Sequence, residues 1–364
     1  MGRLVVEGLC KGWDFPVIDD LSLEVEEGEF FVIVGPSGIG KTSLLRLIAG
    51  LETPDQGTIR VGGRDVTRLP PYQRRVAMTF ESYALYPHMT VAQNIASPLK
   101  AQRVPRAAIA RRVADVTKLL RIDHLLERKP GQISGGQKQR TALGRTLVAD
   151  PEVFLLDEPI SHLDAKIRHE LRSQFHQLED LRRVATLYVT HDYAEALSLG
   201  DRIGVMGNGG RLTHVAGPRE LFEQPATLFV AEHLGQPTIN VIRAELAEEA
   251  GCLIARAGGL TLTLTEAQRA KLNGRGDRRV TVGLRPQHLR PADELPEGTP
   301  IEGRVDLFEA LGSTGVMIAD VGGQKLTALT RPERVFDHAD PVTLGLAVEA
   351  IHLFDPETGR NLML

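Results

Sequence analysis

The chain is poor in the residues and runs that mark several classes of protein. It contains 2 cysteines among 364 residues. Because Cys10 and Cys252 lie far apart in no metal-ligand spacing, we expect neither a disulfide scaffold nor a zinc site. No apolar run approaches the roughly 18 residues that span a bilayer, and the longest, such as residues 30–34, are strand-sized. The first residues lack the apolar region and cleavage site of a secretion signal. We therefore expect a soluble protein of a reducing, cytoplasmic compartment.

An excess of positive charge is also missing. The chain has 43 Lys and Arg residues against 47 Asp and Glu residues, which gives a formal net charge of -4 at pH 7. This balance argues against a protein that binds nucleic acid or anionic lipid through bulk positive charge, although a local basic groove is compatible with it. We expect no nucleic-acid partner. Hydrophobic residues make up 42% and charged residues 25%, which excludes wholesale disorder. The length suits two or three domains.

The first residues of the chain have the pattern of an α/β protein. Residues 21–25 alternate in polarity as a half-buried strand does, and residues 30–34 form the continuous apolar run of a central parallel strand. A Gly-rich loop follows. Residues 41–49 then place their apolar side chains on one face of a predicted helix, and Gly50 is placed to end it.

Further helices and strands are predicted along the chain. Residues 106–120 have helical apolar spacing, and another helix is predicted from about 166 to 181. Apolar strands are predicted at 153–156 and 186–189. Because strands and helices alternate, we predict a parallel sheet with helices on both faces.

The composition and the hydrophobic pattern of the sequence change after about residue 235. The residues Gly235-Gln236-Pro237 have the composition of a linker. Short alternating runs such as 260–264 and 280–284, punctuated by Gly and Pro, follow it and predict a small β-barrel. The predicted domains are residues 1–235, with a helical subdomain at about 88–150, and residues 236–364.

The most specific motif lies between the predicted strand at 30–34 and the predicted helix at 41–49. Residues 35–42, Gly-Pro-Ser-Gly-Ile-Gly-Lys-Thr, match the phosphate-binding loop pattern. Glycines let backbone N–H groups curl around phosphate oxygens, and the helix N-terminus favours an anion. Lys41 would contact the β- and γ-phosphates, and the Thr42 hydroxyl would ligate Mg²⁺. The predicted nucleotide-binding residues are Gly35, Pro36, Ser37, Gly38, Ile39, Gly40, Lys41, Thr42 and Ser43.

Other residues fit the same site. Asp157 and Glu158 follow the apolar strand at 153–156, and a parallel sheet places carboxylates at that end beside the phosphate loop. Asp157 suits Mg²⁺ binding through water, and Glu158 suits a general base for the attacking water. His191 follows another apolar strand at the same predicted edge. Residues 134–137 predict a helix start with a capping box, which is also an anion cradle.

In this order the motifs resemble the nucleotide-binding subunits of ATP-binding cassette (ABC) transporters, especially importers for carbohydrates and related solutes that depend on a binding protein. The resemblance covers almost the whole chain, since residues 283–289 and 352–359 are similar to the accessory β-barrel of these importers. Gly35–Thr42 resembles the family's Walker A loop, Val153–Glu158 its Walker B motif, and Ser134-Gly135-Gly136-Gln137 its signature. Ser161–Asp164 resembles the D-loop, His191 the switch histidine, and Tyr83–Thr90 the segment after the Q-loop.

The resemblance implies a fold and a mechanism. The fold would be a P-loop NTPase core with antiparallel β and helical subdomains, followed by a small all-β domain that is OB-like and TOBE-type. Two ATPase subunits, as a homodimer or a paired heterodimer, would sandwich ATP between the Walker A loop of one and the Ser134 region of the other. The catalytic residues that it implies are Glu158, His191 and Lys41, with Asp164 in the D-loop.

The resemblance also implies partners. Residues 83–89 would line a groove for a coupling helix of a membrane subunit, although the same residues are also compatible with an aromatic core. Two transmembrane permease subunits and, indirectly, a solute-binding protein would complete the transporter at the cytoplasmic face of a bacterial inner membrane. The solute would be a sugar, polyol, glycerol or glycerol phosphate, although polyamine, iron and sulfate importers share the architecture. A soluble ABC ATPase acting on nucleic acid is the alternative from another class, and the single cassette without sustained heptads disfavours it.

Two positions leave alternatives open. Trp13 has the spacing expected of the aromatic residue that stacks on adenine, but the segment is about one residue short of the family pattern, so Phe15 is the alternative. Glu81 stands where the Q-loop carries Gln, and it keeps an oxygen for Mg²⁺ but loses the amide donor. Glu81 is either a tolerated variant of the carbohydrate branch or the mark of a chain that pairs with a different ATPase. The metal ligands that the resemblance implies are Thr42, Glu81 and Asp157.

Overall fold

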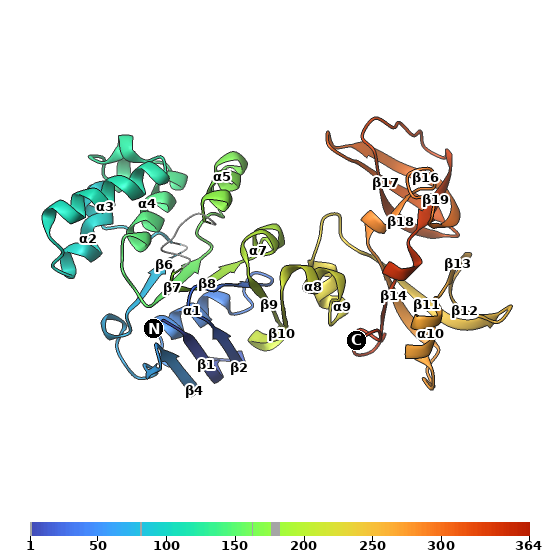
Figure 1. Ribbon diagram of the computed structural model, residues 1–364, viewed down its shortest axis with the longest axis horizontal. Helices are drawn as coiled ribbons and strands as arrows, with labels where there is room; N and C mark the ends of the chain where they lie inside the picture. The colour runs from blue at the N-terminus through green and yellow to red at the C-terminus, as the bar shows by residue number, and fades with distance from the viewer. Residues whose placement is uncertain (1, 81, 162, 176–182) are drawn as a thin grey trace. The chain divides into compact units, whose positions relative to one another are not determined.

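The computed structural model describes residues 2–80, 82–161, 163–175 and 183–364 (Figure 1). The chain divides into two compact units, Met1–Arg219 and Glu220–Leu364. Glu81, His162 and residues 176–181 of the predicted helix lie outside the described residues. The domain boundary that the sequence predicts between residues 235 and 236 stays a prediction.

A six-stranded sheet forms the centre of the first unit. Its strand order is β10-β9-β3-β8-β7-β6, in which neighbouring strands run parallel except for β10 against β9. The strands are β3 (Phe30–Val34), β6 (Val76–Thr79), β7 (Val153–Asp157), β8 (Ala185–Thr190), β9 (Arg202–Gly207) and β10 (Arg211–Ala216). The predicted strands at 30–34, 153–156 and 186–189 and their parallel pairing are confirmed.

Both faces of this sheet are covered, as predicted. On one face, Phe31 and Ile33 pack with Leu44 of α1 (Lys41–Ala49), together with a four-stranded antiparallel sheet of order β2-β1-β4-β5. On the other face, the ring of Tyr188 lies 5.6 Å from that of Phe30 and 6.5 Å from that of Phe175. Phe175 belongs to α5 (Ala165–Phe175), and α7 (Tyr193–Leu199) follows β8. The strands of the antiparallel sheet are β1 (Leu4–Gly12), β2 (Pro16–Val25), β4 (Gln56–Val61) and β5 (Arg64–Asp65).

A helical layer is inserted in the chain between β6 and β7. It consists of α2 (Val91–Ala101), α3 (Arg106–Leu119) and α4 (Gly135–Leu147), and α3 matches the helix predicted at 106–120. Capping boxes begin two of these helices: Thr90 with Gln93 begins α2, and Ser134 with Gln137 begins α4.

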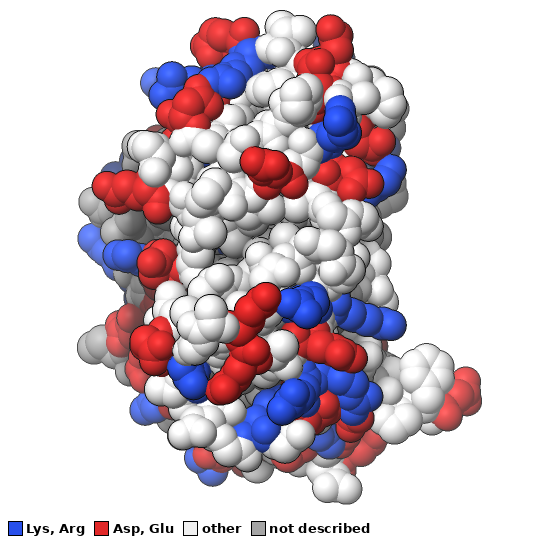
Figure 2. Space-filling model, turned by 90° about the vertical axis from the view of Figure 1, so that its right-hand side faces the viewer, with Lys and Arg blue, Asp and Glu red and all other residues white. Residues whose placement is uncertain are grey.

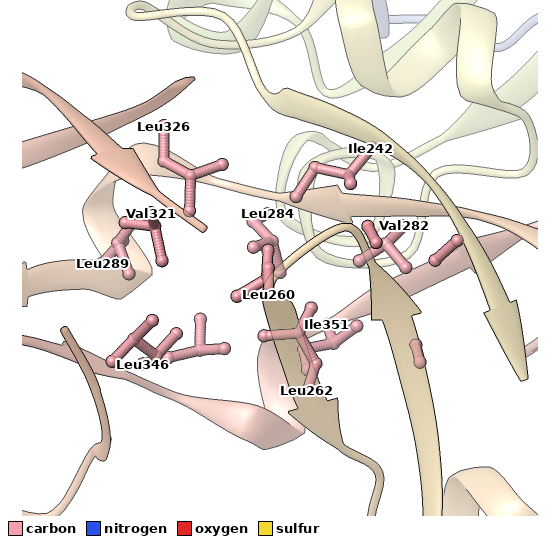
Figure 3. Close-up of a cluster of buried hydrophobic side chains, with 14 of the residues drawn as sticks. Ile242, Leu260, Leu262, Val282, Leu284, Leu289, Val321, Leu326, Leu346 and Ile351 are labelled. Atoms are coloured by element: carbon pink, nitrogen blue, oxygen red, sulfur yellow. The ribbon is translucent and has the colours of Figure 1, made fainter. Parts of the chain in front are cut away.

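Two five-stranded antiparallel sheets form most of the second unit and confirm the predicted all-β domain. Their orders are β13-β12-β11-β14-β20 and β15-β19-β16-β17-β18. Side chains of both sheets meet in one apolar core, where Val282 and Leu284 lie with Leu326 and Leu346 (Figure 3). The strands are β11 (Asn240–Glu249), β12 (Cys252–Ala257), β13 (Leu260–Thr263), β14 (Arg279–Leu284), β15 (Leu289–Pro291), β16 (Thr299–Ala310), β17 (Gly315–Val321), β18 (Gln324–Thr330), β19 (Pro341–Leu346) and β20 (His352–Phe354), and the short helices are α9 (Leu228–His233) and α10 (Glu266–Leu272). The short helix α8 (Pro218–Glu223) begins in the last residues of the first unit and ends in the second.

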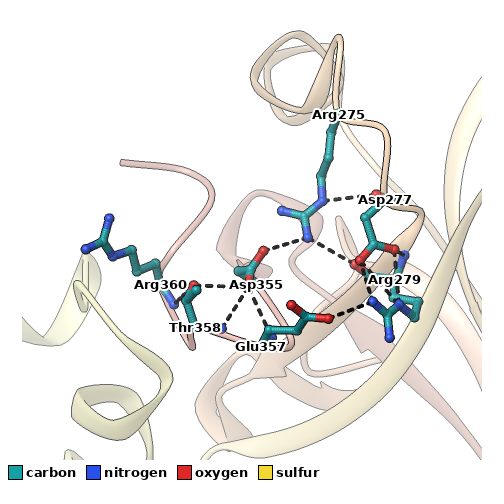
Figure 4. A network of polar contacts seen from close by, with 7 residues as sticks. All are labelled: Arg275, Asp277, Arg279, Asp355, Glu357, Thr358 and Arg360. Atoms are coloured by element: carbon teal, nitrogen blue, oxygen red, sulfur yellow. Dashed lines mark hydrogen bonds and ion pairs between the residues drawn. The ribbon is translucent and has the colours of Figure 1, made fainter.

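A polar network fixes the turn that follows β20 (Figure 4). Asp355 accepts hydrogen bonds from the backbone N–H groups of Thr358 at 2.8 Å and Glu357 at 3.1 Å, and Arg275 donates to it at 2.8 Å. These bonds hold the pKa of Asp355 well below its usual range. Arg279 in turn donates to Glu357 at 3.0 Å. The turn is therefore held from two sides although it lies at the surface.

Acidic and basic side chains are interspersed on the face of the molecule drawn in Figure 2. In the second unit, for example, Arg256 pairs with Glu249 at 2.8 Å and Arg269 with Glu248 at 3.0 Å. Exposed pairs of this kind contribute little to stability individually. Among the described residues, no helix combines the length and the apolar character that a membrane crossing requires.

The C-terminus of α1 is built around Gly50 and Arg74. Gly50 has φ +78° and ends the helix, as predicted. Arg74 is 2% exposed and donates to the carbonyl oxygens of Leu47 at 2.7 Å and Ile48 at 3.0 Å. A Cβ atom at Gly50 would overlap the Arg74 guanidinium. The position therefore needs glycine both for its conformation and for the space that Arg74 takes.

Gly50→Ala should destabilise the first unit much more than Gly63→Ala. Gly63 has φ +79° and nothing within 4 Å of its Cβ position, so it carries the same backbone strain as Gly50 without the overlap. We expect a loss of about 1 kcal/mol for Gly63→Ala and about 3 kcal/mol for Gly50→Ala, measured as the free energy of unfolding in urea. Equal losses in the two variants would contradict the role given to Arg74.

Candidate functional site

The loop predicted to bind phosphate joins β3 to α1, and this position in the chain is the predicted one. Gly38 has φ +79° and Gly40 has φ +112°, which are conformations that glycine adopts without strain. A Cβ atom at Gly35 would lie 2.5 Å from the carbonyl oxygen of Met206, so the loop begins in close contact with β9. Gly40 caps α1 without any side-chain hydrogen bond. The first N–H groups of α1 are therefore not taken by a capping side chain, which suits an anion.

Lys41 and Thr42 connect this loop to the end of β7. Lys41 is 5% exposed, and its Nζ donates to the carbonyl oxygens of Gly35 at 2.8 Å and Pro36 at 2.9 Å. Thr42 Oγ1 donates to Asp157 Oδ1 at 3.1 Å, and Asp157 is 2% exposed. The hydroxyl and the carboxylate are hard oxygen donors beside the phosphate loop, and this donor set fits Mg²⁺. The other predicted loop residues are Ser37, which is exposed, and Ile39 and Ser43, which are half-buried.

Glu158 and His191 meet at the edge of the sheet where β7 and β8 end. Glu158 Oε1 lies 2.9 Å from His191 Nδ1, and the Glu158 side chain is 15% exposed against 51% for His191. A carboxylate that is mostly shielded but open on one side, with an imidazole against one oxygen, is suited to accept a proton from water. The structure thus brings together two residues that the sequence places on separate strands.

The backbone of Glu158 is held by residues that the sequence analysis did not identify. Its φ is +44°, and its N–H donates to the carbonyl oxygen of Val189 at 3.0 Å. Its carbonyl oxygen accepts from Gln139 Nε2 at 3.0 Å and from Ser161 Oγ at 3.1 Å. Gln139 could have been noticed as a polar residue at helical spacing from the apolar residues Ala142 and Leu143, on the buried face of α4.

The signature residues form the start of α4. The Ser134 N–H donates to Gln137 Oε1 at 2.8 Å, and the Gln137 N–H donates to Ser134 Oγ at 3.3 Å, which is the predicted capping box. Gly135 and Gly136 are the first residues of the helix.

In the D-loop, Asp164 Oδ1 accepts from the N–H of Ile167 at 3.0 Å at the start of α5.

The two aromatic candidates for adenine stacking lie in the turn between β1 and β2. Trp13 is 56% exposed and Phe15 is 70% exposed. Lys11 Nζ lies 5.5 Å from the centroid of the Trp13 ring and pairs with Asp55 at 2.9 Å. Both rings are therefore accessible, and Trp13 has the better defined surroundings.

The segment after the Q-loop is a surface feature and not an aromatic core. Tyr86 is 46% exposed, and its ring lies 5.6 Å from the guanidinium of Arg145. Arg145, on α4, also donates to the carbonyl oxygens of Ala84 at 2.8 Å and Tyr83 at 3.1 Å. Asn94, which is fully buried, brackets Tyr86 by accepting from its N–H at 2.8 Å and donating to its carbonyl oxygen at 3.1 Å. The backbone of the segment is thus held while Tyr86 and several neighbouring side chains are exposed.

A buried carboxyl group lies under the His191 loop. Glu195 is 1% exposed, and its Oε2 accepts from Tyr188 Oη at 2.8 Å and Thr190 Oγ1 at 2.9 Å. Burial raises the pKa of Glu195 although these hydrogen bonds lower it. Asp192 caps α7 by accepting from the N–H groups of the first turn. The residues on both sides of His191 are therefore anchored to α7.

Comparisons with known proteins agree with this arrangement. Residues 18–161 match the ABC transporter family, residues 235–289 the MalK OB fold domain and residues 282–354 the TOBE domain. The chain is 41% identical over its full length to the sn-glycerol-3-phosphate import ATP-binding protein UgpC of Ruegeria pomeroyi, of which it covers 99%. It is 40% identical to UgpC of Escherichia coli strain K12, with both chains fully covered.

A solved structure gives the same picture for part of the chain. The ATP-binding cassette MJ0796, in a dimeric post-hydrolysis state bound to ADP and Pi, matches with a TM-score of 0.55 and 26% identity. The match covers 59% of this chain and 99% of that one.

Replacing Glu195 with Gln should make stability less dependent on pH. Because the folded-state pKa of Glu195 is raised, the carboxyl group contributes most below its ordinary value of 4.5, and this contribution falls as the pH rises toward the folded-state pKa. We expect the free energy of unfolding of Glu195→Gln, relative to the wild type, to increase as the pH rises above 4.5, the ordinary pKa of the glutamate side chain. A difference that stays constant on both sides of this pH would contradict a raised pKa for Glu195.

Proposed function

The chain belongs to the ABC transporter family, as an ATPase of a solute importer of the sugar and polyol type, and from this premise we propose that it hydrolyses ATP with Glu158 as the general base. The observation that carries this assignment is the 2.9 Å contact between Glu158 Oε1 and His191 Nδ1. Both residues lie at the edge of the sheet that also carries the phosphate loop, since β3 and β7 both flank β8.

The phosphate-binding loop and α1 bind ATP. The N–H groups around Gly38 and Gly40 and the N-terminus of α1 surround the phosphates, and the Lys41 ammonium leaves the loop carbonyls to contact the β- and γ-phosphates. Thr42 and Asp157 would hold Mg²⁺, with Glu81, outside the described residues, as a further oxygen ligand. The ion, when bound, neutralises charge on the phosphate oxygens.

Hydrolysis then needs one proton acceptor. The attacking water loses its proton to the Glu158 carboxylate as its oxygen bonds to the γ-phosphorus, and the bond to the bridging oxygen breaks to release ADP. His191 keeps the carboxylate in place by bonding to Oε1, so that the second oxygen accepts the proton. Lys41 stabilises the charge that develops on the leaving phosphate oxygens.

The complete site takes residues from two ATPase subunits. Ser134 and the glycines that follow it form a helix N-terminus that binds the γ-phosphate of ATP held by the other subunit. The second subunit is a copy of this chain or a related ATPase. Asp164, in the D-loop, lies where the two ATPase subunits meet.

The transporter is completed by chains that cross the membrane. Two permease subunits receive this ATPase at the cytoplasmic face of the inner membrane, on the surface formed by residues 83–89, and a solute-binding protein delivers the solute. The names of the relatives favour sn-glycerol-3-phosphate as the solute. The test is ATP hydrolysis by the assembled transporter with its binding protein: stimulation by sn-glycerol-3-phosphate supports the proposal, and stimulation only by a polyamine, iron or sulfate would contradict it.

Glu158→Gln should lose hydrolysis and keep ATP binding. The amide has the shape of the carboxylate but cannot accept the proton, so we expect kcat to fall at least about a hundredfold. Lys41→Ala is the contrasting variant, because it should weaken ATP binding itself. Phosphate release and equilibrium binding of ATP measure the two effects, and hydrolysis by Glu158→Gln at the wild-type rate would contradict its role as the base.

The fluorescence of Trp13 should report ATP binding directly, because the chain contains 1 tryptophan. We expect ATP to quench the emission of the wild type, and Trp13→Ala to weaken ATP binding about tenfold through lost stacking. Phe15→Ala is the matched control and should leave both the quenching and the affinity unchanged. Unchanged emission, together with weak binding by Phe15→Ala, would assign the stacking to Phe15 instead.

A further inference from the structure

Gln139 lies in the second turn of α4, with its side chain 2% exposed. Its Nε2 donates to the carbonyl oxygen of Glu158 at 3.0 Å. Its Oε1 has no hydrogen-bond partner among the residues that the structure describes. A buried amide with an unsatisfied oxygen costs stability, and an apolar side chain would serve the packing of α4 better. The contact with Glu158 therefore accounts for a glutamine here better than packing does.

The backbone of Glu158 needs such support. A residue with a Cβ atom at φ +44° is strained by about 1 kcal/mol or more, and such strain persists only where the surroundings hold it. The N–H of Glu158 is fixed by Val189, and its carbonyl oxygen by Gln139 and Ser161. Because these bonds fix the peptide groups on both sides of the Cα atom, they also set the direction in which the side chain leaves toward His191.

We propose that Gln139 is a positioning residue that keeps the Glu158 carboxylate against His191 by anchoring the Glu158 carbonyl to α4. This inference rests on the proposed function, in which Glu158 is the base. The hydrogen bond from Gln139 to the Glu158 carbonyl has a second consequence, because α4 begins at Ser134, which contacts the nucleotide bound to the other subunit. Gln139 thus links the signature, which contacts ATP bound to the other subunit, to the base Glu158, which acts on ATP bound to the same subunit. A displacement of α4 along its axis therefore acts on Glu158 through this hydrogen bond.

Gln139→Met tests the inference, because methionine keeps the unbranched shape of the side chain and removes the donor. We expect kcat for ATP hydrolysis to fall about tenfold or more, through misplacement of the base. The KM for ATP and the equilibrium affinity for ATP should stay within about twofold of the wild type, since Gln139 acts on the base and not on the bound nucleotide. The measurements are steady-state phosphate release and equilibrium binding of ATP on the purified full chain.

Thr117→Val is the matched control. Thr117 is fully buried in α3, and its Oγ1 donates to the carbonyl oxygen of Val113 at 2.8 Å. The substitution removes one buried donor from the same helical layer and should leave kcat unchanged. If Gln139→Met keeps the kcat of this control, or if its kcat and ATP affinity fall together, the inference is overturned.

The variant Glu158→Gln separates this inference from the proposed function. If Glu158→Gln hydrolyses ATP like the wild type, the assignment of the base fails, whatever Gln139→Met does. If Glu158→Gln is inactive and Gln139→Met behaves like Thr117→Val, the base stands and only the role of Gln139 fails.

Discussion

The site depends on two neighbouring parallel strands that end at the same edge of one sheet. In the register of β7 and β8, Asp157 lies opposite Val189, so the chain leaves both strands at nearly the same level. The N–H of Glu158 continues the pairing onto Val189, and the left-handed backbone of Glu158 then turns its side chain toward His191. The contact of Glu158 with His191 thus follows from strand register and one strained residue, and β3 brings the predicted phosphate loop to the same edge.

The helices around the sheet act on this edge from different sides. On one face, α1 carries Lys41 at its start, and its other end is closed by Arg74, a buried side chain bonded to the last carbonyl groups of the helix. On the other face, α7 holds the strand before His191 through Glu195. The helical layer reaches Glu158 through Gln139. Each of these supports is a buried polar side chain bonded to backbone or hydroxyl groups, which fixes position more sharply than apolar packing does.

The sequence predicted the parts of this arrangement that have short-range signals. The apolar runs at 30–34 and 153–156 and the glycine pattern after the first run placed β3, β7 and the loop correctly, because burial and backbone conformation restrict residue type locally. The assignment of Glu158 as the base stays a prediction. The supports were missed because their partners are distant in the chain: Gln139 and Glu158 are linked by a single bond that no periodicity encodes. The alternation after residue 235 predicted an all-β unit, but not how its strands divide into two sheets around one core.

In the proposed site, one chain holds the phosphate loop and the base, and a second ATPase subunit, either a copy of this chain or a related one, supplies the signature. Mixing two inactive variants tests it most directly. In a dimer of a Lys41→Ala copy with a Ser134→Arg copy, one site has both an intact Lys41 and an intact Ser134, whereas neither homodimer has such a site. We expect the mixture to hydrolyse ATP although each variant alone does not. A mixture as inactive as its components would contradict a site shared between two copies of this chain.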